Sequence, residues 1–404
     1  MMWSSCSFIH GDAFYMFKLP LISKCFRLVS LLVVAYTVLY SGFGFAQSAP
    51  LPAPPQLSAE SYLLIDHVSG RVLAEHNVDL RIEPASLTKM MTAYIVIDEL
   101  ALGAAELDEP VVVSEYAQSM PGSRMFVEQG KVVTVGDLLR GLIVQSGNDS
   151  SVALAEHFAG SEQGFVDLMN AKAKELGMNN TRYANSSGLP HPDHYTTARD
   201  LSIIARATIA DHPDFYPMYS EREYEFNGIK QRNRNTLLWR DDSVDGIKTG
   251  HTEAAGYCLV ASAVRDNMRL ISIITGTASD KTRIAESQRL LNYGYRFFRT
   301  EKVYSAGEVI SAARIWMGQE EEIELGVAED LYLTLPRGEF ETLISEIQVA
   351  DYIKAPVDIG DEYGRSLLKS DDEVIGEVPL LALQRVEQGG LFLRMKHSIL
   401  RYFD

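Results

Sequence analysis

The spacing of hydrophobic residues divides the chain into a long mixed region followed by a region of strands. Apolar residues at helical spacing predict helices over residues 87–100, 135–144, 150–158, 162–176, 197–209 and 283–298. Short apolar runs predict strands over residues 61–66, 71–75, 257–264 and 268–275. We therefore expect one domain that contains both helices and strands, over residues 58–300.

The pattern changes after residue 301. Short alternating segments, separated by glycine, proline and acidic residues, predict an all-β domain over residues 301–385. The terminal segment 386–404 reads as an amphipathic helix, with Leu391, Phe392, Met395, Ile399, Tyr402 and Phe403 on one face and Arg394, His397 and Arg401 on the other. Such a helix is typical of a membrane-surface anchor, and an ordinary helix packed on the β domain is the alternative.

The N-terminus has the layout of a secretory signal peptide over residues 1–46. Basic residues precede an apolar run over residues 28–40, and small residues then lead to a cleavage site after Ala46. An uncleaved membrane anchor is the alternative, although the run is short for a bilayer. Met16 is an alternative start. A proline-rich spacer over residues 47–57 follows, so we expect an exported, periplasmic protein with peripheral attachment to the inner membrane.

Composition narrows the possible partners. The chain has 404 residues and a formal net charge of -17, with 54 acidic against 37 basic side chains. This balance argues against a nucleic-acid partner, which would need clustered lysine and arginine. Removal of the signal peptide would leave Cys258 as the only cysteine, and its apolar surroundings predict a buried thiol.

Three short fragments carry candidate chemistry. Ser86 and Lys89 are three residues apart at the start of a predicted helix, so their side chains can reach each other. A serine hydroxyl becomes a good nucleophile when a neighbouring base takes its proton. Burial behind an apolar helix, with a second cation at Lys248, would favour the neutral amine that such a base requires.

The other two fragments follow at a distance. Ser146 and Asn148 lie between two predicted helices, where a loop could present them to a cleft or they could simply cap a helix. Lys248, Thr249 and Gly250 come just before a predicted strand, where they could supply positive charge, a hydroxyl and room for a substrate backbone.

In this order the fragments are Ser-x-x-Lys, Ser-x-Asn and Lys-Thr-Gly, the set found in penicillin-binding proteins and β-lactamases. The wider matches at residues 145–149, 245–252, 254–257 and 332–338 cover both domains. The sequence resembles a Gram-negative D-alanyl-D-alanine carboxypeptidase. The resemblance implies an α/β (α+β) penicillin-binding/β-lactamase-like transpeptidase fold, with a central antiparallel sheet flanked by helices, a C-terminal all-β domain and a terminal amphipathic helix.

The resemblance also implies roles for single residues. Ser86 would attack the bond between the two terminal D-alanines of a peptidoglycan stem peptide, with Lys89 as base, and would bind β-lactam antibiotics covalently. Ser146 and Lys248 would carry the proton to the leaving amine. Asn148, Thr249 and Gly250 would contact the substrate, and the backbone N–H groups of Ser86 and His251 would form the oxyanion hole. Arg234 and Arg283 would lie near the terminal carboxylate of the substrate, with surface ion pairs as the alternative for both.

The alternatives differ in substrate and in turnover. A β-lactamase would need a deacylating glutamate, and the Glu-x-x-Leu-Asn pattern is absent from the sequence. A D,D-endopeptidase would cut cross-links with the same residues but usually lacks the second domain, and a low-turnover peptidoglycan-binding scaffold is a third possibility. Ser187 stands where some relatives carry a histidine in a loop associated with deacylation. The sequence calls for no metal and no cofactor, since His191 and His194 lack a third ligand.

Overall fold

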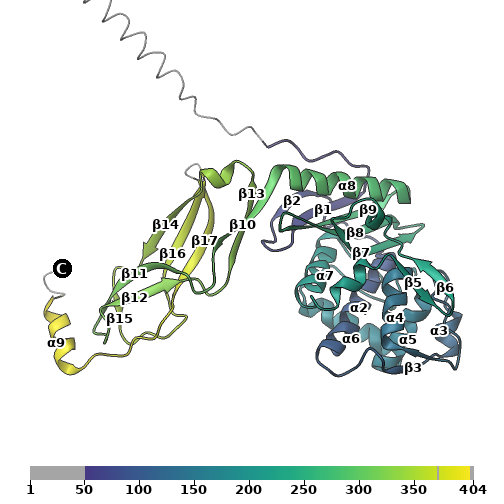
Figure 1. The fold of residues 1–404 in the computed structure, drawn as a ribbon, viewed down its shortest axis with the longest axis horizontal. Coiled ribbons are helices and arrows are strands. Elements are labelled where there is room, and N and C mark those ends of the chain that lie inside the picture. The colour runs from purple at the N-terminus through teal and green to yellow at the C-terminus, as the bar shows by residue number, and fades with distance from the viewer. Residues whose placement is uncertain (1–50, 371–372, 401–404) are drawn as a thin grey trace, which may run out of the picture. The chain divides into compact units, whose positions relative to one another are not determined.

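A five-stranded antiparallel sheet forms the centre of the first domain. The computed structural model describes residues 51–370 and 373–400, so the predicted signal peptide lies outside the described residues. The strand order is β2-β1-β9-β8-β7 (Figure 1). These strands are β1 (Ser61–Asp66), β2 (Val72–His76), β7 (Val244–Thr252), β8 (Gly256–Arg265) and β9 (Met268–Thr277).

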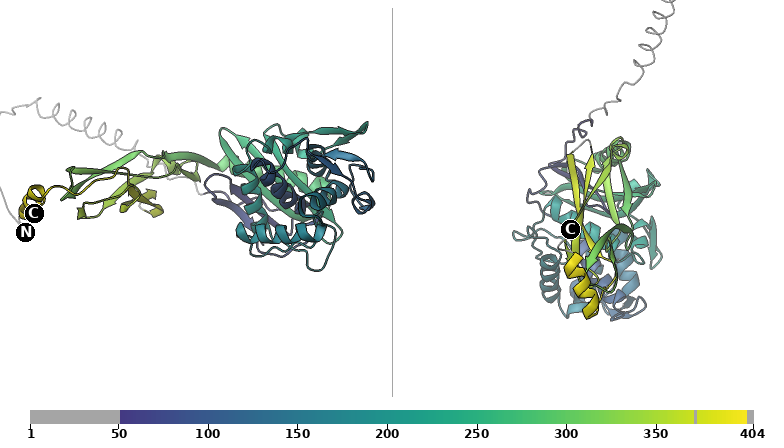
Figure 2. Two further views of the ribbon diagram at one scale, coloured as in Figure 1. Left: turned by 90° about the horizontal axis from the view of Figure 1, so that it is seen from below. Right: turned by 90° about the vertical axis from the view of Figure 1, so that its left-hand side faces the viewer.

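Helices cover both faces of this sheet (Figures 1 and 2). Successive side chains of a strand point to opposite faces, so Leu63 packs in one buried cluster and Leu64 in another. The cluster of Leu64 contains Leu290 and Leu291 of α8 (Asp280–Phe297). The cluster of Leu63 contains the larger group of helices, which also carries the first two candidate fragments.

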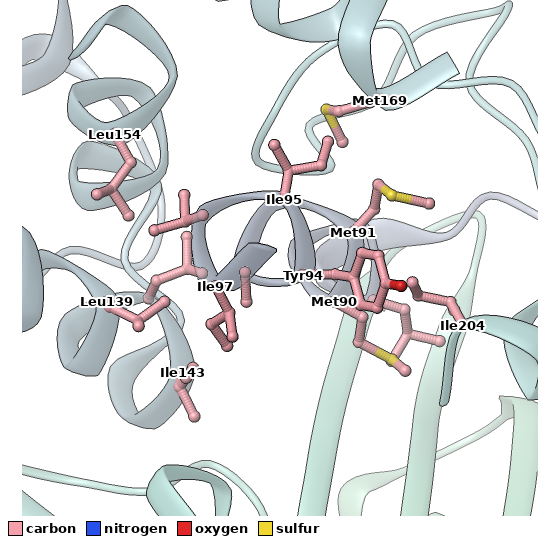
Figure 3. Packing of buried hydrophobic residues seen from close by; sticks show 14 of the residues in the cluster. Met90, Met91, Tyr94, Ile95, Ile97, Leu139, Ile143, Leu154, Met169 and Ile204 are labelled. Carbon is pink, nitrogen blue, oxygen red and sulfur yellow. The ribbon is translucent and has the colours of Figure 1, made fainter. Parts of the chain in front are cut away.

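Helix α2 (Lys89–Ala101) runs through the middle of that larger group. Its residues Met90, Met91 and Ile97 are fully buried. Figure 3 shows α2 surrounded by side chains from neighbouring helices, among them Leu139, Ile143, Leu154, Met169 and Ile204. Those neighbours are α4 (Val135–Arg140), the π-helical turn η2 (Gly141–Gln145), α5 (Asn148–Ala159), α6 (Glu162–Glu175) and α7 (Ala198–Ala210). A helix buried on all sides is a rigid support for catalytic residues at its end.

Shorter elements complete the first domain. They are η1 (Ala85–Thr88), β3 (Pro110–Val112), α3 (Glu115–Ser119), β4 (Val132–Thr134), η3 (Tyr216–Ser220), β5 (Glu223–Phe226), β6 (Ile229–Arg232) and η4 (Thr236–Trp239). The hairpin of β5 and β6 turns at Asn227 and Gly228, both with positive φ. The sequence patterns did not predict this hairpin or the strand β7.

The C-terminal domain is all-β, as predicted. A six-stranded sheet has the order β14-β16-β17-β12-β11-β15, and β10 pairs with β13. Its strands are β10 (Phe298–Tyr304), β11 (Val309–Trp316), β12 (Glu322–Gly326), β13 (Leu331–Pro336), β14 (Ile344–Val349), β15 (Ile353–Lys354), β16 (Glu362–Ser370) and β17 (Glu373–Ala382), with the turn η5 (Glu339–Glu341). Ile323, Leu325 and Leu380 lie in its separate core.

The predicted terminal helix is present as α9 (Leu391–Leu400). Its apolar residues Leu391, Phe392, Met395 and Ile399 are all exposed. His397, expected on the polar face, is buried: its ring packs edge-on against Trp316, and its Nδ1 accepts a hydrogen bond from the Met317 N–H (2.7 Å) of the β domain. Within residues 51–370 and 373–400, none of the helices is long and apolar enough to cross a membrane.

Candidate active site

Ser86 lies in a single 3-10 turn, η1, that leads into helix α2. The preceding residue, Ala85, has a positive φ of 47°, which is a strained conformation for a residue with a side chain. Strand β7 packs against this turn at Gly250, where a Cβ atom would lie 3.1 Å from the Pro84 carbonyl oxygen and from Leu87 Cγ. Gly250 thus allows close contact between the third fragment and the turn that carries the serine.

Lys89 opens α2 and is 1% exposed. Its Nζ lies 3.2 Å from Ser86 Oγ, 2.7 Å from Asn148 Oδ1 and 2.5 Å from the Ser187 carbonyl oxygen. Burial lowers the pKa of Lys89 to about 7, against a raising effect of the Asp149 carboxylate. The neutral form of Lys89 is therefore well populated at neutral pH. Burial is what lowers this pKa, and the charge of Lys248, which the sequence suggested as a second cause, does not contribute.

Ser146 follows the π-helical turn and has a left-handed conformation, with a φ of 65°. A strained residue of this kind is frequent at functional sites, because the surrounding structure must hold it in place. Its Oγ accepts a hydrogen bond from Lys248 Nζ at 2.8 Å. Asn148 begins α5 and donates from Nδ2 to the Pro121 carbonyl at 2.6 Å, while its Oδ1 accepts a hydrogen bond from Lys89 Nζ.

Lys248, Thr249 and Gly250 lie within β7 rather than before a strand. Strand β7 is an edge of the five-stranded sheet, so its outer backbone groups have no neighbouring strand. Burial lowers the pKa of Lys248 well below its ordinary value, and the nearby cations Lys89, Arg283 and Arg234 lower it further. Such a lysine gives up its proton readily, which suits a proton path through Ser146.

A cleft of about 690 Å³ brings most of these residues together. The predicted site residues along its wall are Ser86, Ser146, Thr249, Gly250, His251, Arg234 and Arg283. Arg283 is 6% exposed and donates from Nη1 to the backbone carbonyls of Gly250 (2.9 Å) and Cys258 (3.1 Å). Arg283 therefore also braces β7, whereas Arg234 is exposed to the cleft.

The sequence patterns missed the contact of the loop at residues 185–189 with Lys89. The Asn185 side-chain oxygen accepts hydrogen bonds from the N–H groups of Ser187 (3.2 Å), Gly188 (2.7 Å) and Leu189 (3.1 Å). Gly188 has a φ of 86°, and a Cβ there would lie 1.8 Å from the Ala85 carbonyl oxygen. The resemblance singled out Ser187 for its side chain, whereas the contact with Lys89 is made by its backbone carbonyl, which has no signature in the sequence.

One further expectation concerns a cysteine that takes no part in the contacts of the cleft. Cys258 is a fully buried free thiol, as predicted, and burial raises its pKa to about 11. In the part of the chain that the structure describes, no group of three histidine, cysteine or acidic side chains could hold a metal ion.

A serine hydroxyl at the wall of an open cleft, with a buried lysine amine beside it, defines a serine acyl-transfer site. Residues 47–279 match the peptidase S11 family, described as D-alanyl-D-alanine carboxypeptidase, and residues 298–388 match the C-terminal domain of penicillin-binding protein 5. The chain belongs to the peptidase S11 family of D-alanyl-D-alanine carboxypeptidases.

Single relatives agree with this assignment. The D-alanyl-D-alanine carboxypeptidase DacA of Escherichia coli strain K12 is 43% identical over 350 residues, which are 85% of this chain and 87% of that protein. Penicillin-binding protein 5 of Haemophilus influenzae is 40% identical, with a TM-score of 0.81 over 83% of this chain and all of that one. Penicillin-binding protein D2 of Listeria monocytogenes in its ampicillin-bound form is 29% identical, with a TM-score of 0.55 over 60% of this chain and all of that one. The resemblance and the penicillin-binding fold predicted from the sequence are therefore confirmed.

Proposed function

We propose that this chain removes the terminal D-alanine from peptidoglycan pentapeptides through an acyl-enzyme on Ser86. The observation that carries the proposal is the position of the Lys89 amine, 3.2 Å from Ser86 Oγ and enclosed by carbonyl oxygens. The match of residues 298–388 to a penicillin-binding protein domain favours a carboxypeptidase over the endopeptidase alternative.

The contacts of Lys89 orient its lone pair. A neutral amine has two N–H donors and one lone pair. Asn148 Oδ1 and the Ser187 carbonyl oxygen can only accept, so they take up the two N–H groups. The lone pair is left for the third neighbour, the Ser86 hydroxyl, which makes Lys89 a general base that needs no rearrangement.

The reaction then runs in two halves. Ser86 Oγ attacks the carbonyl carbon between the two D-alanines and its proton passes to Lys89 Nζ, while the backbone N–H groups of Ser86 and His251 stabilise the oxyanion. The C–N bond breaks as the leaving nitrogen takes a proton from Ser146 Oγ, which Lys248 replaces across its 2.8 Å contact. Water then attacks the ester carbon and its proton passes through Ser146 Oγ to the neutral Lys248, while Lys89 returns its proton to Ser86 Oγ as the ester bond breaks.

The cleft suits a peptide that ends in a carboxylate. The hydroxyl of Thr249 and the guanidinium group of Arg234 line its wall and can bind a carboxylate. Arg283 also lines it, but its Nε and Nη2 are paired with the Asp280 carboxylate, so it contributes mainly positive charge. The outer edge of β7 can pair with the substrate backbone as an added strand would. A β-lactam presents a comparable carboxylate and amide, so it should acylate Ser86 in place of the peptide.

Release of D-alanine tests the proposal. Purified protein should liberate D-alanine from a muropeptide pentapeptide, and Ser86→Ala should abolish the release while the protein remains folded. Cross-linked muropeptides in the same assay test the endopeptidase alternative, because an endopeptidase would cleave the cross-link. Silence of the wild-type protein on the pentapeptide, or unchanged activity of Ser86→Ala, would contradict the proposal.

We further propose that the chain is exported by its N-terminal signal peptide and attaches to the inner membrane from the periplasm through α9. The exposed apolar residues of α9 support this attachment, because burial in lipid would remove them from water. Phe392→Glu should weaken binding to vesicles with anionic lipid, whereas Ser398→Glu adds the same charge at an exposed polar position and should weaken it much less. Equal losses, or no loss, would argue against an anchor on this face.

A further inference from the structure

An exposed aromatic ring stands at the wall of the catalytic cleft without a role in the reaction. Phe126 lines the same cleft as Ser86 and Ser146, and it is 44% exposed. Its neighbours Met125 and Val127 are 0% and 3% exposed and belong to the core of the domain. The loop therefore inserts two side chains into the core and leaves the ring between them about half exposed, with the Arg124 guanidinium 5.5 Å from the ring centre.

The backbone at Phe126 is held in a costly conformation. Its φ is 70°, in the left-handed region that bulky residues rarely adopt. The buried Asp149 carboxylate holds it there, because it accepts hydrogen bonds from the N–H groups of Met125 (2.9 Å), Phe126 (2.8 Å) and Val127 (3.2 Å). Strain that the surrounding structure enforces at a functional cleft indicates that the presented side chain has a use.

A second exposed apolar side chain lines the same cleft from another element. Ile229 begins β6, is 41% exposed, and shares with Phe126 both the catalytic cleft and an adjoining pocket of about 310 Å³. The two elements are tied together, since Gln231 Nε2 of β6 donates to the Met125 carbonyl at 3.1 Å. We call Phe126 and Ile229 the apolar lip.

We propose that the apolar lip determines specificity by binding an aliphatic side chain in the acyl part of the peptide substrate. The inference rests on the proposed function, in which the leaving group is D-alanine. Beyond its nitrogen, that group offers only a methyl and a carboxylate, and the carboxylate suits Arg234 and Thr249. The part of the substrate with longer aliphatic side chains is the acyl part, which stays attached to Ser86 in the same cleft.

Two synthetic peptides that differ at one position test this. Both end in D-alanyl-D-alanine, and the residue before them is an acetylated lysine in one peptide and glycine in the other. Phe126→Asn is the informative variant, because asparagine tolerates the left-handed region and keeps the backbone while it removes the ring. Ile229→Thr keeps a β-branched residue in the strand, and Leu168→Asn, which removes an exposed apolar side chain that does not line the cleft, is the control.

Wild-type protein should prefer the lysyl peptide. Phe126→Asn should lower kcat/KM for the lysyl peptide about tenfold, mainly through KM, and change kcat/KM for the glycyl peptide by less than about twofold. Ile229→Thr should act in the same direction and Leu168→Asn should not. Equal losses on both peptides, or no loss on either, would overturn the inference. Absence of D-alanine release by the wild type from both peptides would instead refute the proposed function.

Discussion

Acylation of this protein by benzylpenicillin should rise with pH and level off above about 7. Burial moves the pKa of Lys89 from 10.5 to about 7, which corresponds to about 5 kcal/mol in favour of the neutral amine. At pH 7 about half of the molecules then carry a neutral Lys89, against about 1 in 3,000 for an ordinary lysine. Below the pKa the protonated amine has no lone pair, so the rate should fall about tenfold for each pH unit.

The assay is the second-order rate of labelling by a fluorescent penicillin between pH 5 and 9, with circular dichroism to verify that the protein stays folded. His251 also lines the cleft, so a His251→Gln variant is the control, and its profile should keep the same midpoint. A rate that is constant between pH 5 and 9, a midpoint near 10, or a midpoint that moves in His251→Gln would refute the assignment of Lys89 as the base.

Two further substitutions test the loop at residues 185–189 and the general base Lys89. Gly188→Ala should destabilise the protein by more than about 3 kcal/mol and slow acylation, because the new Cβ would meet the Ala85 carbonyl. Gly177→Ala is the control, since Gly177 has a similar φ of 84° but lies in open space, and it should cost only about 1 kcal/mol. Thermal unfolding measures both losses of stability. Similar losses in both would show that the contact with Ala85 is unimportant. Lys89→Arg keeps the charge but offers no base, so penicillin labelling should vanish; labelling at the wild-type rate would exclude Lys89 from proton transfer.

The helices were predictable because their apolar residues have one dominant period. Helix α2 begins at Lys89, two residues after the predicted start, because the chain first makes the 3-10 turn that carries Ser86. Sequence patterns do not distinguish such a turn from the first turn of a helix, since both place residues at similar spacing.

The third fragment was recognised by its motif, but its strand was not. Strand β7 is buried over most of its length, and it combines Lys248, Thr249 and two glycines with few apolar residues, so no alternation marks it. The β5–β6 hairpin did carry a signal, because Asn227 and Gly228 form the dipeptide that two-residue hairpin turns favour.

The contacts of Lys89 were predictable only in part. The pairing with Ser86 followed from helical spacing, whereas Asn148 and the Ser187 carbonyl come from segments 59 and 98 residues away. A backbone carbonyl has no signature in the sequence, because every residue carries one. The contacts of Lys89 with Asn148 and with the Ser187 carbonyl could therefore be found only from the three-dimensional structure.

The residue that benzylpenicillin acylates decides whether Ser86 is the nucleophile. Intact-mass measurement after incubation with benzylpenicillin should show one adduct for each protein molecule, and peptide mapping should locate it on Ser86. The adduct should be absent from Ser86→Ala. An adduct on any other residue, or an adduct that persists in Ser86→Ala, would contradict the account.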